Sequence, residues 1–224
     1  MVFDANKINS LKLEKPILPE SLKGGAGTII IDPAWDLQQK GHFGAVNHYS
    51  LMTLEQIKAL PVGDLCAKDA SVWLWCTAAT LPHAYAILKI WGFTPRAPFV
   101  WVKNRMGLGQ YLRNFCEFCI LGTRGKSLPA IRNQPNVGLF PVQDHSHKPE
   151  EAYDIIERMY PDRPRLELFA RRPRHGWHAW GNEIPSDIVI PGYPVPEYSP
   201  LLLNDLSRRA AENDNGKSQR RCDD

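Results

Sequence analysis

Residues 24–35 read GGAGTIIIDPAW and combine a short apolar run with the polar turn that ends it. The β-branched stretch from Thr28 to Ile31 carries no charge, and Asp32-Pro33 follows it directly. Such a run between glycines and an Asp-Pro pair is typical of a buried strand followed by a loop. The stretch therefore predicts a buried β-strand that ends at Asp32.

The flanking sequence alternates between apolar runs and helical patterns. Helices are predicted to begin at Thr53, which has capping-box spacing, at Thr80, which has a proline close behind it, and at Pro149. Further strands are predicted at residues 71–76, 97–102, 115–121, 165–170 and from 177 to 180. Strands alternating with helices of about ten residues predict an α/β fold, with a mainly parallel sheet and helices on both faces.

The length and composition indicate one folded domain. The chain has 224 residues, of which 43% are hydrophobic, enough for one buried core. We assign residues 24–190 to the domain and residues 1–23 to an N-terminal lead. From Asn204 onward acidic and basic residues alternate with almost nothing apolar, so residues 191–224 are predicted to be a disordered polar tail.

The same composition excludes several classes of protein. No stretch approaches the ~20 apolar residues of a membrane-spanning helix, and Asp4 and Glu14 interrupt the region where a secretory signal would lie. Five cysteines, an odd number, favour free thiols over a disulfide framework. We therefore expect a cytoplasmic protein without a membrane partner. A net charge of +3 permits binding to a polyanion without demanding it.

Residues 32–35, here called the DPAW turn, place a carboxylate, a free carbonyl and a flat aromatic ring at a strand end, where α/β proteins bind ligands. Alkylation of the amino group of adenine needs such a set. If Asp32 and the Pro33 carbonyl each accept one N–H of that amine, its lone pair can point at an electrophile. Trp35 would stack on the base, after the base is flipped from any duplex. A structural turn with a core tryptophan is the alternative for so short a motif.

Further motifs follow the DPAW turn in chain order, and together with it they span residues 27–184: YSLMTLE (49–55), WLW (73–75), WGF (91–93), FVWVK (99–103), HKPE (147–150), LELFAR (166–171) and WHAWGN (177–182). As a set they are far more specific than any one of them. With these motifs the sequence resembles the adenine-N6 methyltransferases of the DPPW class. That family includes the catalytic subunit of the eukaryotic messenger-RNA adenosine methyltransferase and many bacterial and phage enzymes.

The resemblance implies a Rossmann-like methyltransferase fold in circularly permuted order, with S-adenosylmethionine as the methyl donor. Carried over by position, Asp32 would face both the target amine and the ammonium of the donor, and Lys148 would pair with the donor carboxylate. Arg171, Asn182 and Glu183 would contact the ribose or adenine of the donor.

Two further positions follow from the same resemblance. Glu167 would orient Lys148 or a ribose hydroxyl of the donor, and Tyr49 falls on a loop that closes over the target base in the family. The one departure is Ala34, where the family has a second proline, and this removes stiffness from the turn. The family also contains inactive partner subunits, so a catalytically inactive nucleic-acid-binding partner is the alternative to an enzyme.

The expected partner is a nucleic acid, with DNA favoured over RNA because small single-domain members of the family are bacterial and phage enzymes. A homo- or heterodimer stays open. Lys103, Arg113 and Asn114 follow the third predicted strand and offer cationic and amide groups for phosphates and base edges. A solvated rim is the equal alternative for these side chains.

Two other patterns suggest metal binding. Cys116 and Cys119 have half of a zinc-site spacing, but positions three apart in a strand face opposite sides of a sheet. Histidines at positions 145, 147, 175 and 178 would suit a metal-dependent nuclease, yet no acidic cluster accompanies them. We therefore expect no metal site.

Overall fold

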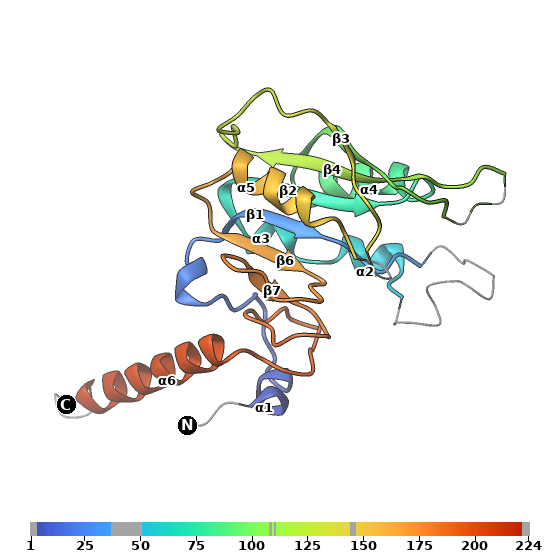
Figure 1. The fold of residues 1–224 in the computed structure, drawn as a ribbon. Helices are drawn as coiled ribbons and strands as arrows, with labels where there is room; N and C mark the ends of the chain where they lie inside the picture. The colour runs from blue at the N-terminus through green and yellow to red at the C-terminus, as the bar shows by residue number, and fades with distance from the viewer. Residues whose placement is uncertain (1–3, 37–50, 108, 110, 144–146, 221–224) are drawn as a thin grey trace.

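The strands build one sheet in the order β5-β3-β4-β2-β1-β6-β7 (Figure 1). A computed structural model of the chain describes residues 4–36, 51–107, 109, 111–143 and 147–220. The strands are β1 (Ala26–Ile31), β2 (Cys66–Cys76), β3 (Thr94–Val102), β4 (Cys116–Arg124), β5 (Val137–Leu139), β6 (Arg165–Leu168) and β7 (His178–Trp180). All neighbouring pairs are parallel except those of β4, which runs antiparallel to both β2 and β3.

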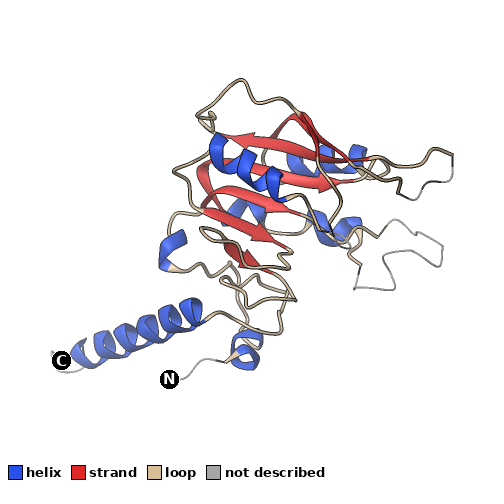
Figure 2. Ribbon diagram, in the orientation of Figure 1, coloured by secondary structure: helices blue, strands red, loops and turns tan. Residues whose placement is uncertain are grey.

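Helices cover both faces of this sheet (Figures 1 and 2). They are α1 (Ala5–Asn9), the 3-10 turn η1 (Glu20–Leu22), α2 (Leu54–Lys58), α3 (Val62–Leu65), α4 (Leu81–Ile90), α5 (Glu150–Met159) and α6 (Pro200–Arg220). In β1, Ile30 packs with the cluster under α5, whereas Ile29 and Ile31 pack with the cluster on the α4 side. None of the helices in the described part of the chain is both long and apolar enough to cross a membrane.

The prediction of an α/β Rossmann-like fold with a mainly parallel sheet and helices on both faces is confirmed. β1, which leads into the DPAW turn, pairs in parallel with the later strand β6. Thr53 caps α2 with both hydrogen bonds of a capping box, as its spacing predicts. The antiparallel direction of β4 and the three-residue β5 are features that the sequence did not reveal.

The carboxyl-terminal region differs from the disordered tail that the sequence predicts. Val195, Tyr198, Leu202 and Leu206 are buried in the main core, and α6 extends away from the sheet (Figure 1). The physical reason is that a few apolar anchors at wide spacing suffice to dock an otherwise polar segment, and composition averaged over the segment does not register them.

The N-terminal lead likewise belongs to the folded body. Ile8 and Leu22 are buried in the same core cluster, and Ile17 pairs with Val189 in an antiparallel bridge. Both ends of the chain therefore pack beside the β6–β7 end of the sheet. Within the carboxyl-terminal segment, residues 192–194 line the cavity described next.

Candidate active site

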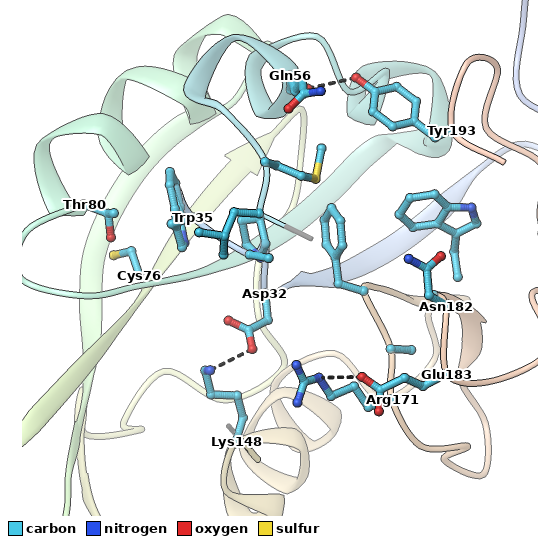
Figure 3. A pocket seen from close by; sticks show the side chains of 18 of the residues that line it. Asp32, Trp35, Gln56, Cys76, Thr80, Lys148, Arg171, Asn182, Glu183 and Tyr193 are labelled. Atoms are coloured by element: carbon cyan, nitrogen blue, oxygen red, sulfur yellow. Dashed lines mark hydrogen bonds and ion pairs between the residues drawn. The ribbon is translucent and has the colours of Figure 1, made fainter. Parts of the chain in front are cut away.

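The DPAW turn lies at the carboxyl end of β1 and lines a cavity of about 510 Å³ (Figure 3). The wall also contains Cys76, the last residue of the neighbouring parallel strand β2, and Thr77, the residue after it. In an open α/β sheet this edge is where ligands bind. Asp32 therefore lies at a ligand-binding edge because it comes directly after β1.

Backbone hydrogen bonds fix the shape of the turn. The Trp35 N–H donates to the Pro33 carbonyl at 2.9 Å, and the Met52 N–H donates to the Ala34 carbonyl at 2.8 Å. The indole N–H of Trp35 donates to the Trp75 carbonyl at 3.1 Å, which holds the ring against β2. A carbonyl oxygen has two lone pairs, so Pro33 keeps one for a further donor.

Asp32 belongs to a line of alternating charges beneath the cavity. The Lys148 ammonium donates to Asp32 at 2.7 Å and lies 3.3 Å from a Glu117 oxygen. The second Glu117 oxygen accepts a hydrogen bond from the Lys103 ammonium. Burial works to lower the pKa of Lys148, but the two carboxylates outweigh it and raise that pKa, so Lys148 stays protonated.

The two carboxyl groups of this line differ in their electrostatics. Burial raises the pKa of Asp32, and the ammonium of Lys148 offsets part of the rise. Burial also works to raise the pKa of Glu117, but Lys148 and Lys103 outweigh it and lower that pKa. Glu117 is therefore held as a charged carboxylate between two ammonium groups, a role that its place in an apolar strand did not suggest.

The loops after β6 and β7 form another part of the wall of the first cavity. It includes Arg171, Asn182 and Glu183, and the Arg171 guanidinium lies 3.3 Å from the Glu183 carboxylate (Figure 3). Phe169 begins this wall with a φ of +65°, a conformation that costs of order 1–3 kcal/mol in a residue other than glycine. A side chain at Gly181 would meet the Ala170 carbonyl at 2.1 Å, so the two loops touch through their backbones.

Glu167 lines a second cavity, of about 600 Å³, that shares Asp32, Lys148 and Arg171 with the first. Its carboxylate accepts a hydrogen bond from the Tyr153 hydroxyl at 2.7 Å. Burial raises the pKa of Glu167 to about 7. The structure thus places Glu167 beside α5, whereas the other predicted donor-binding side chains line the first cavity.

Of the residues expected to touch the nucleic acid, Trp35 lines the first cavity, whereas Lys103, Arg113 and Asn114 line neither cavity. Lys103 points to Glu117, with its ammonium 4.8 Å from the Trp101 ring. Arg113 and Asn114 are exposed in the described part of the loop between β3 and β4 and line neither cavity. Tyr49 lies outside the described residues.

Two of the candidate metal ligands, His147 and His178, have other partners. The His147 ring lies 2.9 Å from Glu150, and the His178 ring lies 3.0 Å from the Ser21 hydroxyl. Cys119 is buried and Cys116 is only partly so. Within the described ranges, no three His, Cys, Asp or Glu side chains are grouped to hold a metal ion.

Comparison with known proteins gives a consistent result. The chain matches the MT-A70 family over residues 27–183. It is 30% identical to the type II methyltransferase M.MunI of Mycoplasma sp over 209 residues, which cover 83% of this chain and 88% of that protein. It is 28% identical over 180 residues to the human N(6)-adenosine-methyltransferase catalytic subunit METTL3, covering 75% of this chain and 30% of that one.

The match to a plant relative also covers a much larger share of this chain than of the relative. The chain is 30% identical over 171 residues to a probable N(6)-adenosine-methyltransferase MT-A70-like protein of rice, Oryza sativa subsp. japonica, and the match covers 72% of this chain. It covers 23% of the rice protein. The chain thus spans less than a third of these adenosine methyltransferases but nearly all of M.MunI.

Proposed function

This chain belongs to the MT-A70 family, and we propose that it transfers a methyl group from S-adenosylmethionine to N6 of adenine in nucleic acid, with DNA favoured over RNA. One observation carries the proposal. The DPAW turn presents a carboxylate, a carbonyl and an indole ring to one cavity, with the Lys148 ammonium 2.7 Å from the Asp32 carboxylate.

The donor set of the first cavity fits S-adenosylmethionine. Asp32 and Lys148 offer the opposite charges that the ammonium and carboxylate of an amino acid require. Asn182 and Glu183 offer groups that hydrogen-bond ribose hydroxyls, and Arg171 is held beside them. When bound, S-adenosylmethionine supplies a methyl group made electrophilic by its sulfonium.

The turn is proposed to position the target amine. Asp32 and the free lone pair of the Pro33 carbonyl each accept one N–H of the amine, which turns the nitrogen lone pair toward the methyl group. The Trp35 ring, fixed by its bond to Trp75, stacks on the base. The nitrogen would bond to the methyl carbon as the carbon–sulfur bond of the donor breaks, which releases the demethylated donor. The proton that the nitrogen loses would pass to the Asp32 carboxylate that accepts its N–H.

The choice of DNA rests on the match to M.MunI. It covers 88% of M.MunI but 30% or less of the human and rice adenosine methyltransferases. M.MunI is a type II methyltransferase that acts on DNA, and the proposed substrate of this chain is taken from it. RNA is the second candidate substrate, because the longer relatives are named as adenosine methyltransferases.

The test is transfer of labelled methyl from S-adenosylmethionine to matched single- and double-stranded DNA and RNA, followed by nucleoside mass analysis. We expect label in N6-methyladenine, highest with DNA. Asp32→Asn should lower the rate at least about 100-fold, because it removes the charge that the amine and the donor ammonium share. Asp64→Asn, on the exposed surface of α3, is the matched control and should transfer at the wild-type rate.

Two results would count against the proposal. Near-normal transfer by Asp32→Asn would remove Asp32 from the chemistry. Absence of transfer to all four polymers, together with absence of donor binding in calorimetry, would favour the catalytically inactive partner instead.

A further inference from the structure

Residues 186–199, here called the strap, form one wall of the first cavity. The strap follows residue 183, where the match to the MT-A70 family ends. Its two ends are tied together, because the Ser186 N–H donates to the Glu197 carbonyl and the Ser199 N–H donates to the Ser186 carbonyl. Its apolar side chains Ile188, Val189, Ile190, Val195 and Tyr198 are buried in the main core.

The strap is also bonded to the loop that carries Asn182. The Ser186 hydroxyl accepts a hydrogen bond from the Gly181 N–H at 3.1 Å and can donate to the Gly181 carbonyl at the same distance. The strap and the loop after β7 are therefore hydrogen-bonded to each other. Three strap residues, Gly192, Tyr193 and Pro194, line the cavity.

Tyr193 is held in this wall at three points. Its hydroxyl donates to the Gln56 carbonyl of α2 at 2.9 Å. Its ring meets the edge of the Trp180 ring at 6.4 Å between centroids and 80° between planes. Its backbone N–H donates to Ile190 across a turn in which Gly192 has a φ of +77°. An aromatic ring fixed in this way needs little further ordering to bind a ligand.

Figure 3 places Tyr193 on the same side of Asp32 as Asn182, whereas Trp35 lies on the other side. The aromatic wall on the Asn182 side continues from Tyr193 through Trp180 to Phe169, whose ring meets Trp180 at 5.3 Å. Polar groups for a ribose and aromatic faces for a purine thus occur together at this end of the cavity. The end near Trp35 is left for the target base.

We propose that Tyr193 binds the methyl donor, with its ring forming part of the surface on which the purine of S-adenosylmethionine packs. This inference rests on the proposed function, because it takes the cavity to be the donor site. It makes the strap, outside the matched family region, a part of that site.

The test measures the affinity for S-adenosylhomocysteine, the demethylated donor, by titration calorimetry with the full chain. Tyr193→Ala should weaken binding roughly 5- to 100-fold, the range expected for loss of one stacking partner. Tyr193→Phe keeps the ring and loses only the bond to Gln56, so its affinity should stay within about threefold of wild type. Tyr193→Leu fills the space without an aromatic face and serves if the alanine variant does not fold.

Tyr198→Phe is the control for loosening of the strap. Tyr198 belongs to the strap, and this variant loses the hydrogen bond that the Tyr198 hydroxyl donates to Asn9. Tyr198 does not line the cavity. Its affinity should equal that of wild type even if its melting temperature falls. In methyl transfer, Tyr193→Ala should raise KM for the donor with little change in kcat.

The inference is overturned if folded Tyr193→Ala and Tyr193→Leu bind S-adenosylhomocysteine as tightly as wild type, or if Tyr198→Phe weakens binding as much as they do. In both cases wild type still binds the ligand, and the proposed function stands. If wild type neither binds the ligand nor transfers methyl, the proposed function fails and takes this inference with it.

Discussion

Glu167→Gln should stabilise the fold at alkaline pH and have little effect at acid pH. Burial raises the pKa of Glu167 to about 7 from an ordinary value of 4.5, and the Tyr153 hydroxyl offsets part of the rise. An acid with a raised pKa binds more protons in the folded state than in the unfolded state. The free energy of unfolding therefore falls as the pH rises from about 4.5 to about 7, and the loss persists above that range.

The size of the effect follows from the two pKa values. For a folded-state pKa of about 7 and an unfolded value of 4.5, linkage gives a loss of about 2–3 kcal/mol between pH 5 and pH 8. Glutamine keeps the shape and can still hydrogen-bond to Tyr153, but it carries no charge to bury. The free energy of unfolding of the variant should thus exceed that of wild type by about 2–3 kcal/mol more at pH 8 than at pH 5.

Urea unfolding followed by tryptophan fluorescence measures this difference at the two pH values. Tyr153→Phe is the companion variant, because it removes the hydroxyl that stabilises the Glu167 carboxylate and leaves the carboxylate in place. It should move the loss of stability to higher pH and make it larger. An equal difference between Glu167→Gln and wild type at pH 5 and at pH 8 would refute the reasoning.

Two more predictions concern the charged line and the carboxyl terminus. Glu117→Gln leaves the Lys148 ammonium with one carboxylate instead of two, and we expect a loss of about 2–4 kcal/mol in urea unfolding at pH 7. Because the pKa of Glu117 is lowered, the difference in free energy of unfolding between wild type and Glu117→Gln should disappear as the pH falls below 4.5. A difference that persists there would contradict the role of Glu117 as a charged carboxylate. Deleting residues 200–224 removes the buried Leu202 and Leu206 of α6 and should lower the free energy of unfolding by about 3–6 kcal/mol. Equal stability of the truncated chain and the full chain would show that α6 does not dock as described.

The sequence predicts the part of the fold whose pattern is local. The run that ends at Ile31 is uncharged because β1 is paired on both sides and covered on both faces, so its signal is strong. The helices at Thr53 and Thr80 follow from signals within a few residues. β5 was missed because three residues with a central glycine carry no periodic signal, and its pairing with β3 is set by the whole sheet.

The candidate site divides in the same way. Asp32 and Trp35 could be predicted because a ligand-binding edge follows from a strand that has just ended. Glu117 could not, because an acid in an apolar strand is tolerable only with cationic partners, here Lys103 and Lys148, that come from distant segments. Tyr193 belongs to a segment that composition predicts to be disordered, and its role depends on contacts with α2 and β7.

Ala34 bears on whether the site is that of an enzyme or of an inactive partner. A proline at a compatible position adds about 0.4–1 kcal/mol of stability by restricting the unfolded chain. Here the carbonyl of Ala34 accepts the Met52 N–H at 2.8 Å, and the Asp36 N–H donates to the Met52 carbonyl at 3.0 Å. Each of these two hydrogen bonds contributes about 0.5–1.5 kcal/mol of stability. Together they contribute at least as much as a proline would add by restricting the unfolded chain. Since neither bond needs a proline ring, the turn can hold Asp32 and Trp35 in place without one, and the alanine is no argument against catalysis.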